Sequence, residues 1–137
     1  MKIYRLLSVT LFALVSVFTA WGQEPQQPQT PEQREKQLME AVDREVQRLG
    51  RLLDLEYWQE FYVDSTLTHD FREMTTELEG LQRAKVENTD LYINVQDKWM
   101  ERIDSSYRRF FTEEQWKKYW KSGGKKAQQE RDKRKKK

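Results

Sequence analysis

The residues that most often carry out chemistry in proteins are sparse in this sequence. Its 137 residues include one histidine, His69, and no cysteine. This composition excludes disulfides, thiol catalysis, cysteine-ligated metals and a multi-histidine metal site within one chain. With Asp70 and Glu73 nearby, His69 could join a metal site or act as a pH switch, whereas the simpler interpretation is a histidine on a helix surface. We predict no metal, no cofactor and no catalytic residue.

The acidic residues also lack the setting that acid–base catalysis needs. Glu56, Glu60 and Asp64 recur every four residues, which places them on one face of a helix. Such a face can attract cations weakly, and its default interpretation is a solvated surface. Carboxylates that work as acid and base need burial in a cleft to shift their pKa values, and nothing in the sequence indicates one. Phosphate-loop, dinucleotide, zinc-protease and serine-hydrolase motifs are absent as well, so we predict that the protein is not an enzyme.

Aromatic residues are the chemically distinctive feature. Residues 23–137 hold 13 of them, gathered mainly around positions 57–62 and 107–120. They can form the core of a thin helical bundle, or some can line a groove or an interface. Adjacent residues on a helix point about 100° apart, so a two-layer hairpin cannot readily bury both members of an adjacent pair. The predicted protein-binding residues are Tyr57, Trp58, Phe61, Tyr62, Phe110, Phe111, Trp116 and Trp120.

The first 22 residues have the pattern of a secretory signal peptide. Lys2 and Arg5 precede an apolar run over residues 6–20, and small residues occupy the positions before a cleavage site after Gly22. The alternative, an uncleaved membrane anchor, is disfavoured because the run is shorter than the roughly 20 residues that span a bilayer. We therefore predict cleavage after Gly22 and a periplasmic or secreted protein.

Downstream of the signal, the sequence predicts a linker followed by helices. Residues 23–31 hold all three prolines and are predicted to form a Gln/Pro-rich spacer. The alternative is that this segment packs on the helical body. Residues 32–122 form the predicted helical domain. Capping residues and apolar positions spaced by three and four indicate a helix from Pro31, a long one over 55–86 with Asp54 as its candidate cap, and a short one after Thr112. They also indicate a third helix after the polar break at residues 87–90, for which Asn88, Thr89 and Asp90 are all candidate caps. The fold class is all-α: an elongated helical hairpin or bundle of three to four amphipathic helices, without a sheet.

Charge divides the chain into an acidic body and a basic tail. Residues 23–122 carry a net charge of −6, and residues 123–137 carry +6. We predict that this tail is disordered. It can contact an anionic envelope surface such as lipid headgroups or acidic polysaccharide, or the acidic body of a second copy. Nucleic acid is not an expected partner.

One motif resembles a known family. Phe111-Thr112-Glu113-Glu114-Gln115 matches the Leu-Thr-x-x-Gln motif of the Spy/CpxP group of small periplasmic proteins, with Phe in place of Leu. A second copy aligns with Leu53-Asp54-Leu55-Glu56-Tyr57, where Asp and Tyr replace Thr and Gln. The resemblance implies a long helical hairpin, often a cradle-shaped antiparallel dimer. It also implies ATP-independent chaperone or envelope-stress activity, and some relatives sense metals through His, Met and acidic ligands.

These observations together predict an exported, non-enzymatic binding protein. Its aromatic-rich helical surface would bind apolar segments of other proteins, in the manner of an ATP-independent, stress-response chaperone. The alternative is a structural or adaptor subunit of a cell-envelope complex with one specific partner. A homodimer is compatible with either function.

Overall fold

The computed structural model describes residues 28–137, within which residues 31–137 form one compact unit. The predicted signal peptide, its cleavage site and the first five residues of the predicted linker lie outside the described residues. Helices follow one another in the order α1 (Pro31–Leu53), α2 (Tyr57–Arg83), α3 (Thr89–Phe110), α4 (Glu113–Tyr119), the π-helical turn η1 (Trp120–Gly124) and α5 (Lys125–Lys135). The linker predicted over 23–31 therefore ends one residue earlier, because Pro31 already belongs to α1.

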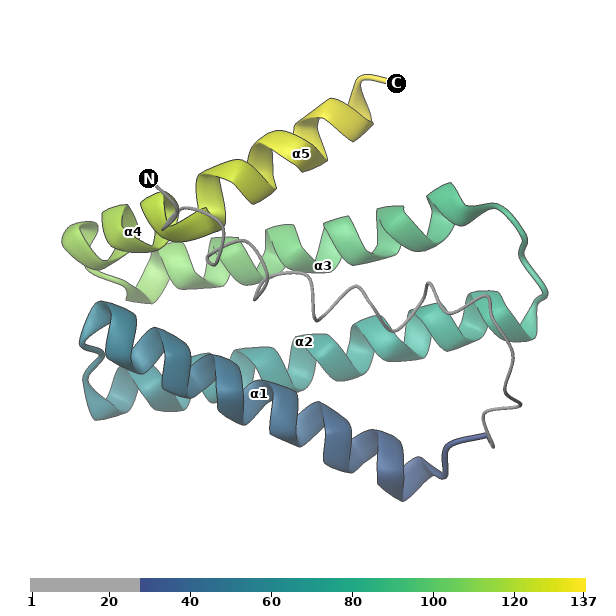
Figure 1. The fold of residues 1–137 in the computed structure, drawn as a ribbon, viewed down its shortest axis with the longest axis horizontal. Helices are drawn as coiled ribbons and strands as arrows, with labels where there is room; N and C mark the ends of the chain where they lie inside the picture. The colour runs from purple at the N-terminus through teal and green to yellow at the C-terminus, as the bar shows by residue number, and fades with distance from the viewer. Residues whose placement is uncertain (1–27) are drawn as a thin grey trace, which may run out of the picture. The chain divides into compact units, whose positions relative to one another are not determined.

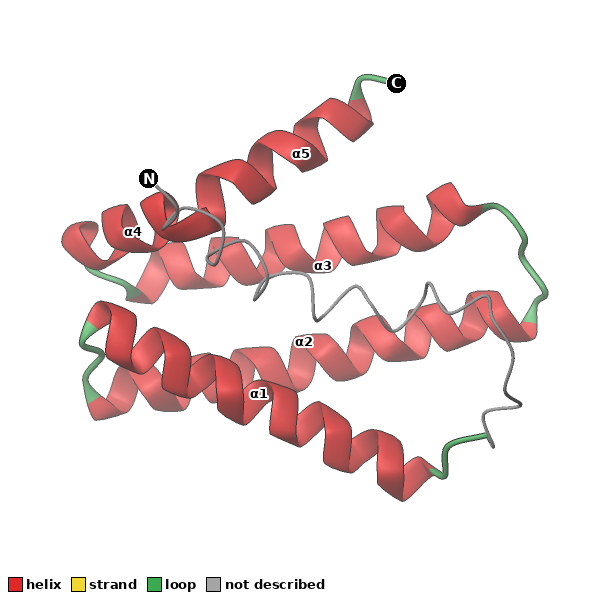
Figure 2. Ribbon diagram, viewed as in Figure 1, coloured by secondary structure: helices red, strands yellow, loops and turns green. Residues whose placement is uncertain are grey.

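The all-α prediction is confirmed. Every regular element in residues 28–137 is helical, and this part of the chain contains no strand (Figure 2). Within the same residues, no helix combines the length and the apolar character needed to cross a membrane.

The helix boundaries follow from local capping. Of the three candidate caps before α3, Asn88 is the one that accepts a hydrogen bond, from the Asp90 backbone N–H (3.0 Å). Thr112 forms a capping box with Gln115, as predicted. The start of α2 differs from the prediction, since its cap is Glu56. Asp54 instead adopts a left-handed conformation (φ 51°) in the turn between α1 and α2, a conformation that Asp tolerates better than most residues.

A single core joins α1, α2, α3 and α4. α2 packs against both α3 and α1, and α4 packs on α1. Figure 1 shows α2 and α3 side by side and α1 crossing α2. The buried core residues come from all four helices and from the α3–α4 turn, and they are Val42, Leu49, Leu53, Val63, Leu67, Ile103, Tyr107, Phe111 and Tyr119.

The prediction of a disordered tail over residues 123–137 is wrong. The chain turns at Gly123 and continues as α5, which Figure 1 shows beside α3 and spreading away from it towards the C-terminus. Gly123 has φ 152°, a conformation that residues with a side chain rarely adopt. The prediction failed because it was based on composition alone, and α5 has almost no apolar residues. Its contacts come instead from charged groups on α3, which the composition of the tail does not reveal.

Replacing each of two glycines by alanine is expected to change the stability of the protein in opposite directions. A Cβ added at Gly80, in the last turn of α2, meets no atom within 4 Å. Gly80→Ala is therefore expected to raise the free energy of unfolding by about 0.5–1 kcal/mol, because alanine loses less backbone entropy in a helix. Gly123→Ala is the matched control and is expected to destabilise by about 1–3 kcal/mol through backbone strain. Urea unfolding of both variants checks this, and equal effects would contradict it.

Candidate protein-binding surface

Exposed aromatic side chains gather at the start of α2. Tyr57 is 87% exposed, Trp58 46%, Phe61 62% and Tyr62 52%, and we call these four residues the aromatic patch. In residues 28–137, seven large hydrophobic side chains are exposed, and the patch holds four of them. The others, Met39, Leu52 and Leu91, lie on two other helices. The patch is thus a local concentration of apolar surface.

Helix geometry directs the patch away from the core. In the same stretch of α2 the buried positions are Gln59 and Val63, four residues apart. Tyr57 and Phe61 are likewise four residues apart and lie on the opposite side of the helix, at about 100° per residue. Apolar spacing alone predicts that Trp58, Phe61 and Tyr62 belong to the inward stripe of α2, and this prediction is wrong. The structure leaves the three side chains exposed, and the inward stripe begins at Gln59.

The patch rings contact one another and are anchored at one edge. Trp58 and Phe61 each pack edge-on against Tyr62, with ring centroids 6.1 and 5.9 Å apart. The indole N–H of Trp58 donates a hydrogen bond to Glu56 Oε2 (2.6 Å). Tyr62 in turn stacks on half-buried Phe110 of α3, with centroids 5.9 Å apart. These contacts restrict the rings in the free protein, so the side chains of the patch would lose less conformational entropy on binding a ligand.

The remaining predicted binding residues do not belong to this patch. Phe111 is 6% exposed and stacks on Tyr107 in the core (4.9 Å), which contradicts its prediction as a surface binding residue. It is buried because Phe111 is the C-cap of α3, at the turn into α4 over the core. Trp116 and Trp120 stack on each other, half-buried, on α4 and η1 (5.5 Å).

Two capping boxes lie at the base of the patch, that is, at the helix start from which the patch residues project and at the adjoining start of α4. Glu56 and Gln59 form one box at the start of α2, and Thr112 and Gln115 form the other at the start of α4. The two glutamine amides bond to each other in both directions, Gln59 Nε2 to Gln115 Oε1 (2.7 Å) and Gln115 Nε2 to Gln59 Oε1 (3.0 Å). This reciprocal pair joins the first turns of α2 and α4, which positions the patch on the core.

The paired boxes revise the placement of the second motif copy. Sequence comparison aligned it with residues 53–57, whereas the structure forms the box two residues later, at Leu55-Glu56-Tyr57-Trp58-Gln59. Gln59 was not singled out from the sequence, because the inward positions of this helix were assigned from apolar residues. The Glu-x-x-Gln spacing that precedes a helix was the signal that could have found it.

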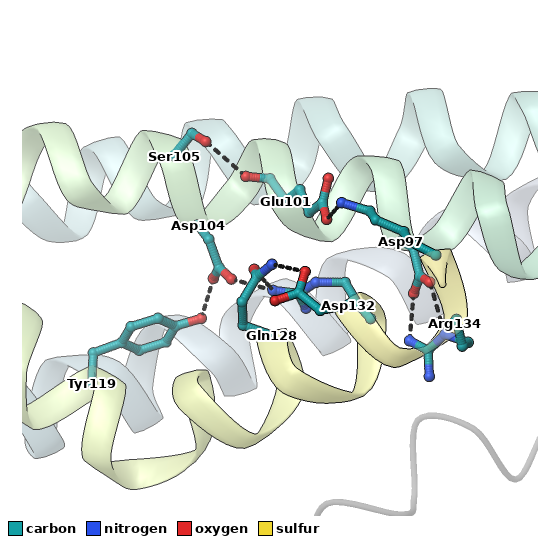
Figure 3. Close-up of polar contacts among 10 residues, drawn as sticks. Asp97, Glu101, Asp104, Ser105, Tyr119, Gln128, Asp132 and Arg134 are labelled. Carbon is teal, nitrogen blue, oxygen red and sulfur yellow. Dashed lines mark hydrogen bonds and ion pairs between the residues drawn. The ribbon is translucent and has the colours of Figure 1, made fainter. Parts of the chain in front are cut away.

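A buried cluster of three hydrogen-bonded side chains, Asp104, Tyr119 and Arg131, joins α5 to α3. The sequence did not indicate this cluster. Asp104 Oδ1 accepts a hydrogen bond from the Tyr119 hydroxyl (2.5 Å), and Asp104 Oδ2 accepts one from Arg131 Nη2 (2.7 Å). Figure 3 shows Asp104 on α3 facing Tyr119. Burial, with the nearby negative charge of Asp104, raises the pKa of the Tyr119 phenol far above its usual range. Tyr119 is therefore the hydrogen-bond donor to Asp104 at any physiological pH.

The other chemically suggestive residues, His69 and its neighbours, lie on α2. His69 Nδ1 lies 2.8 Å from Asp70 Oδ1, and Arg102 Nε approaches the same oxygen at 3.4 Å, so both side chains contact this carboxylate. Within residues 28–137 no group of three or more His, Cys, Asp or Glu side chains has an arrangement that could hold a metal ion. Glu73 lies exposed on α2 outside this pairing.

Comparison with known proteins finds no match among protein-family models, curated proteins or solved structures. The proposed function therefore rests on the residues and contacts of this chain.

Proposed function

We propose that this protein is an exported, non-enzymatic binding protein that captures apolar segments of other proteins through the aromatic patch, without ATP. The observation that carries the proposal is the exposure of four adjacent aromatic side chains, Tyr57, Trp58, Phe61 and Tyr62, on one helix. With aromatic residues contributing roughly 200 Å² each, they leave on the order of 500 Å² exposed. Patches of this size are at the upper end for monomeric proteins and commonly mark binding sites.

The charges beside the patch narrow the class of client. Glu56, Glu60 and Asp64 follow one edge of the patch along α2, and Glu56 and Asp64 are exposed. Such an acidic edge favours a segment in which basic residues flank the apolar ones. The preferred client is therefore an unfolded or partly folded chain that exposes apolar residues next to Lys or Arg.

The motif geometry supports the same proposal from a different direction. The two capping boxes, which resemble the motif of the Spy/CpxP group, lie together at the base of the patch. The resemblance points to periplasmic chaperones, and the signal pattern of residues 1–22 points to export. Both are part of the proposal.

A triple substitution in the patch tests the proposal. The variant Tyr57→Ser, Trp58→Ser, Phe61→Ser is expected to lose the ability to suppress aggregation of a thermally unfolding client protein by about tenfold or more, since aromatic contacts dominate such interfaces. The side chains are exposed, so the helical content and the urea midpoint should change little. Light scattering of the client with increasing amounts of each chain, in the absence of ATP, gives the measurement.

The matched control removes the same number of large hydrophobic side chains elsewhere. Met39→Ser, Leu52→Ser, Leu91→Ser takes away the other exposed large hydrophobics of residues 28–137 and is expected to retain suppression. Equal losses in both variants, or no suppression by the unaltered chain at stoichiometric excess, would contradict the proposal. Recovery of one stable partner by pull-down, with no suppression of unrelated clients, would support the alternative of an adaptor subunit.

A further inference from the structure

α5 has two faces with different surroundings. The inner face, which consists of Arg131, Arg134 and Lys135, forms ion pairs with α3. Arg131 pairs with Asp104 (2.7 Å), and Arg134 makes two hydrogen bonds to Asp97 (2.8 and 2.7 Å). Lys135 pairs with Glu101. Figure 3 shows Asp97 facing Arg134 and Glu101 on the same side of α3 as Asp104. The three carboxylates lie at spacings of four and three residues, so they form one stripe that holds the helix in a fixed orientation.

The outer face of α5 is rich in lysines, with exposed Gln129 among them and the exposed acids Glu130 and Asp132 at its two edges. Lys125, Lys126, Lys133 and Lys136 lie within an arc of about 100° when placed at 100° per residue, on the side opposite buried Arg131. Lys137 follows directly after them, and all five lysines are exposed. Lys133 contacts Glu130 on the same helix at 3.0 Å, and no ion pair is formed by the other four among the described residues. This lysine face extends over roughly 18 Å at 1.5 Å per residue.

The basic residues are distributed by type as well as by face. Both arginines of α5 bind carboxylates on α3, whereas every basic residue of the outer face is a lysine. Arginine suits the fixed, forked geometry of a carboxylate, and lysine acts as a mobile point charge that needs no defined partner geometry. The outer face is thus built for an extended anionic surface more than for a single shaped pocket.

We propose that the lysine face of α5 docks on anionic phospholipid headgroups while its inner face stays on α3. Charge complementarity selects this occupant: juxtamembrane lysines each contribute measurably to binding of anionic bilayers, and a row of five acts together. The lysine face carries no aromatic residue that could stack on a base and no arginine that could bind a base edge, which argues against nucleic acid. Binding brings the protein to a membrane surface and does not depend on the proposed function of the aromatic patch.

Vesicle sedimentation with matched charge variants tests the proposal. The outer-face variant changes Lys125, Lys126, Lys133, Lys136 and Lys137 to Gln. The control variant changes five exposed cations outside α5 to Gln, namely Lys36, Arg44, Arg51, Lys85 and Lys117. Both variants lose the same charge, and both keep residues 1–27 unchanged, so any contribution of that segment is common to all chains. Each is mixed with vesicles of phosphatidylcholine alone, or of phosphatidylcholine and phosphatidylglycerol in equal amounts.

The unaltered chain is expected to sediment with the phosphatidylglycerol vesicles far more than with phosphatidylcholine alone, and less as salt is added. The outer-face variant should partition about 100-fold more weakly, and the control variant less than tenfold more weakly. Equal losses in the two variants would overturn the proposal, because net charge alone would then explain binding. Release from the vesicles by duplex DNA, with tighter binding of the DNA than of the lipid, would overturn it in favour of a nucleic-acid surface.

Discussion

Replacing Asp104 by alanine is expected to release α5 from α3. The substitution leaves the Arg131 guanidinium, which is 4% exposed and already has an unpaired Nε, without its carboxylate. It also removes the acceptor of the Tyr119 hydroxyl. Breaking a buried ion pair from one side costs about 3–5 kcal/mol, because the remaining charge stays buried and unpaired.

The chain can avoid most of that cost by detaching α5. The helix is joined to the bundle through Gly123, and its other two ion pairs to α3 are more exposed, worth about 0–1 kcal/mol each. Once detached, Arg131 returns to water. An isolated helix of 11 residues with almost no apolar side chains is marginal in water, so α5 should then unfold. The expected result is local: α5 loses its structure, and α1 to α4 keep theirs.

Hydrogen exchange and trypsin digestion measure this release directly. In Asp104→Ala the amides of α5 should exchange, and its basic residues should be cleaved, about 100-fold faster or more, which corresponds to a loss of about 3 kcal/mol in docking free energy. Glu101→Ala is the control, because it removes a carboxylate of α3 whose partner Lys135 is exposed; its effect should stay below tenfold. Equal effects would mean that general attraction between charges holds α5, and the buried pair does not.

A double substitution separates loss of the pair from loss of packing. Asp104→Leu combined with Arg131→Met replaces both charges by apolar side chains of similar length, and such replacements of buried ion pairs are often neutral or stabilising. Protection of α5 should then recover to within about tenfold of the unaltered chain. Failure to recover would show that Asp104 acts chiefly through Tyr119.

The sequence predicted those parts of the fold that depend on local pattern. The helical character of the chain and the capping box at Thr112 follow from apolar spacing and capping chemistry, and they agree with the structure. These features depend on residues a few positions apart, so a single chain read in order contains the information needed to place them.

Features that depend on a distant partner were not predicted. α5 reads as a solvated tail until the carboxylates of α3, 27 residues or more before their partners, are placed beside it. At the start of α2, hydrophobicity alone assigns the inward position to an aromatic residue, yet the structure gives it to Gln59 because Gln115 of α4 completes its hydrogen bonds. Because the Gln59 amide occupies the position that faces the core, the neighbouring aromatic residues of the patch remain exposed.

Gln59→Leu is expected to lower the free energy of unfolding by about 3 kcal/mol. Gln59 is 1% exposed, and its amide accepts a hydrogen bond from the Glu56 backbone N–H (2.9 Å) and donates one to the Phe110 carbonyl (3.0 Å). Leucine fills a similar volume but pairs with neither group, and each buried polar group left without a partner costs about 1–3 kcal/mol. Gln82→Leu, at an exposed position of the same helix, should change stability by less than about 0.5 kcal/mol.

A double-mutant cycle with Gln115→Leu shows whether the two amides act as one unit. Gln115 donates through Nε2 to Gln59 and to the Leu53 carbonyl (3.4 Å), and its Oε1 accepts from the Thr112 backbone N–H (2.9 Å). If the reciprocal pair links the starts of α2 and α4, the double variant should lose about 1–2 kcal/mol less than the two single losses together, because the second substitution removes a group already deprived of its partner. Additive losses in urea unfolding would instead mean that each glutamine serves its own helix start, with no link between them at the base of the aromatic patch.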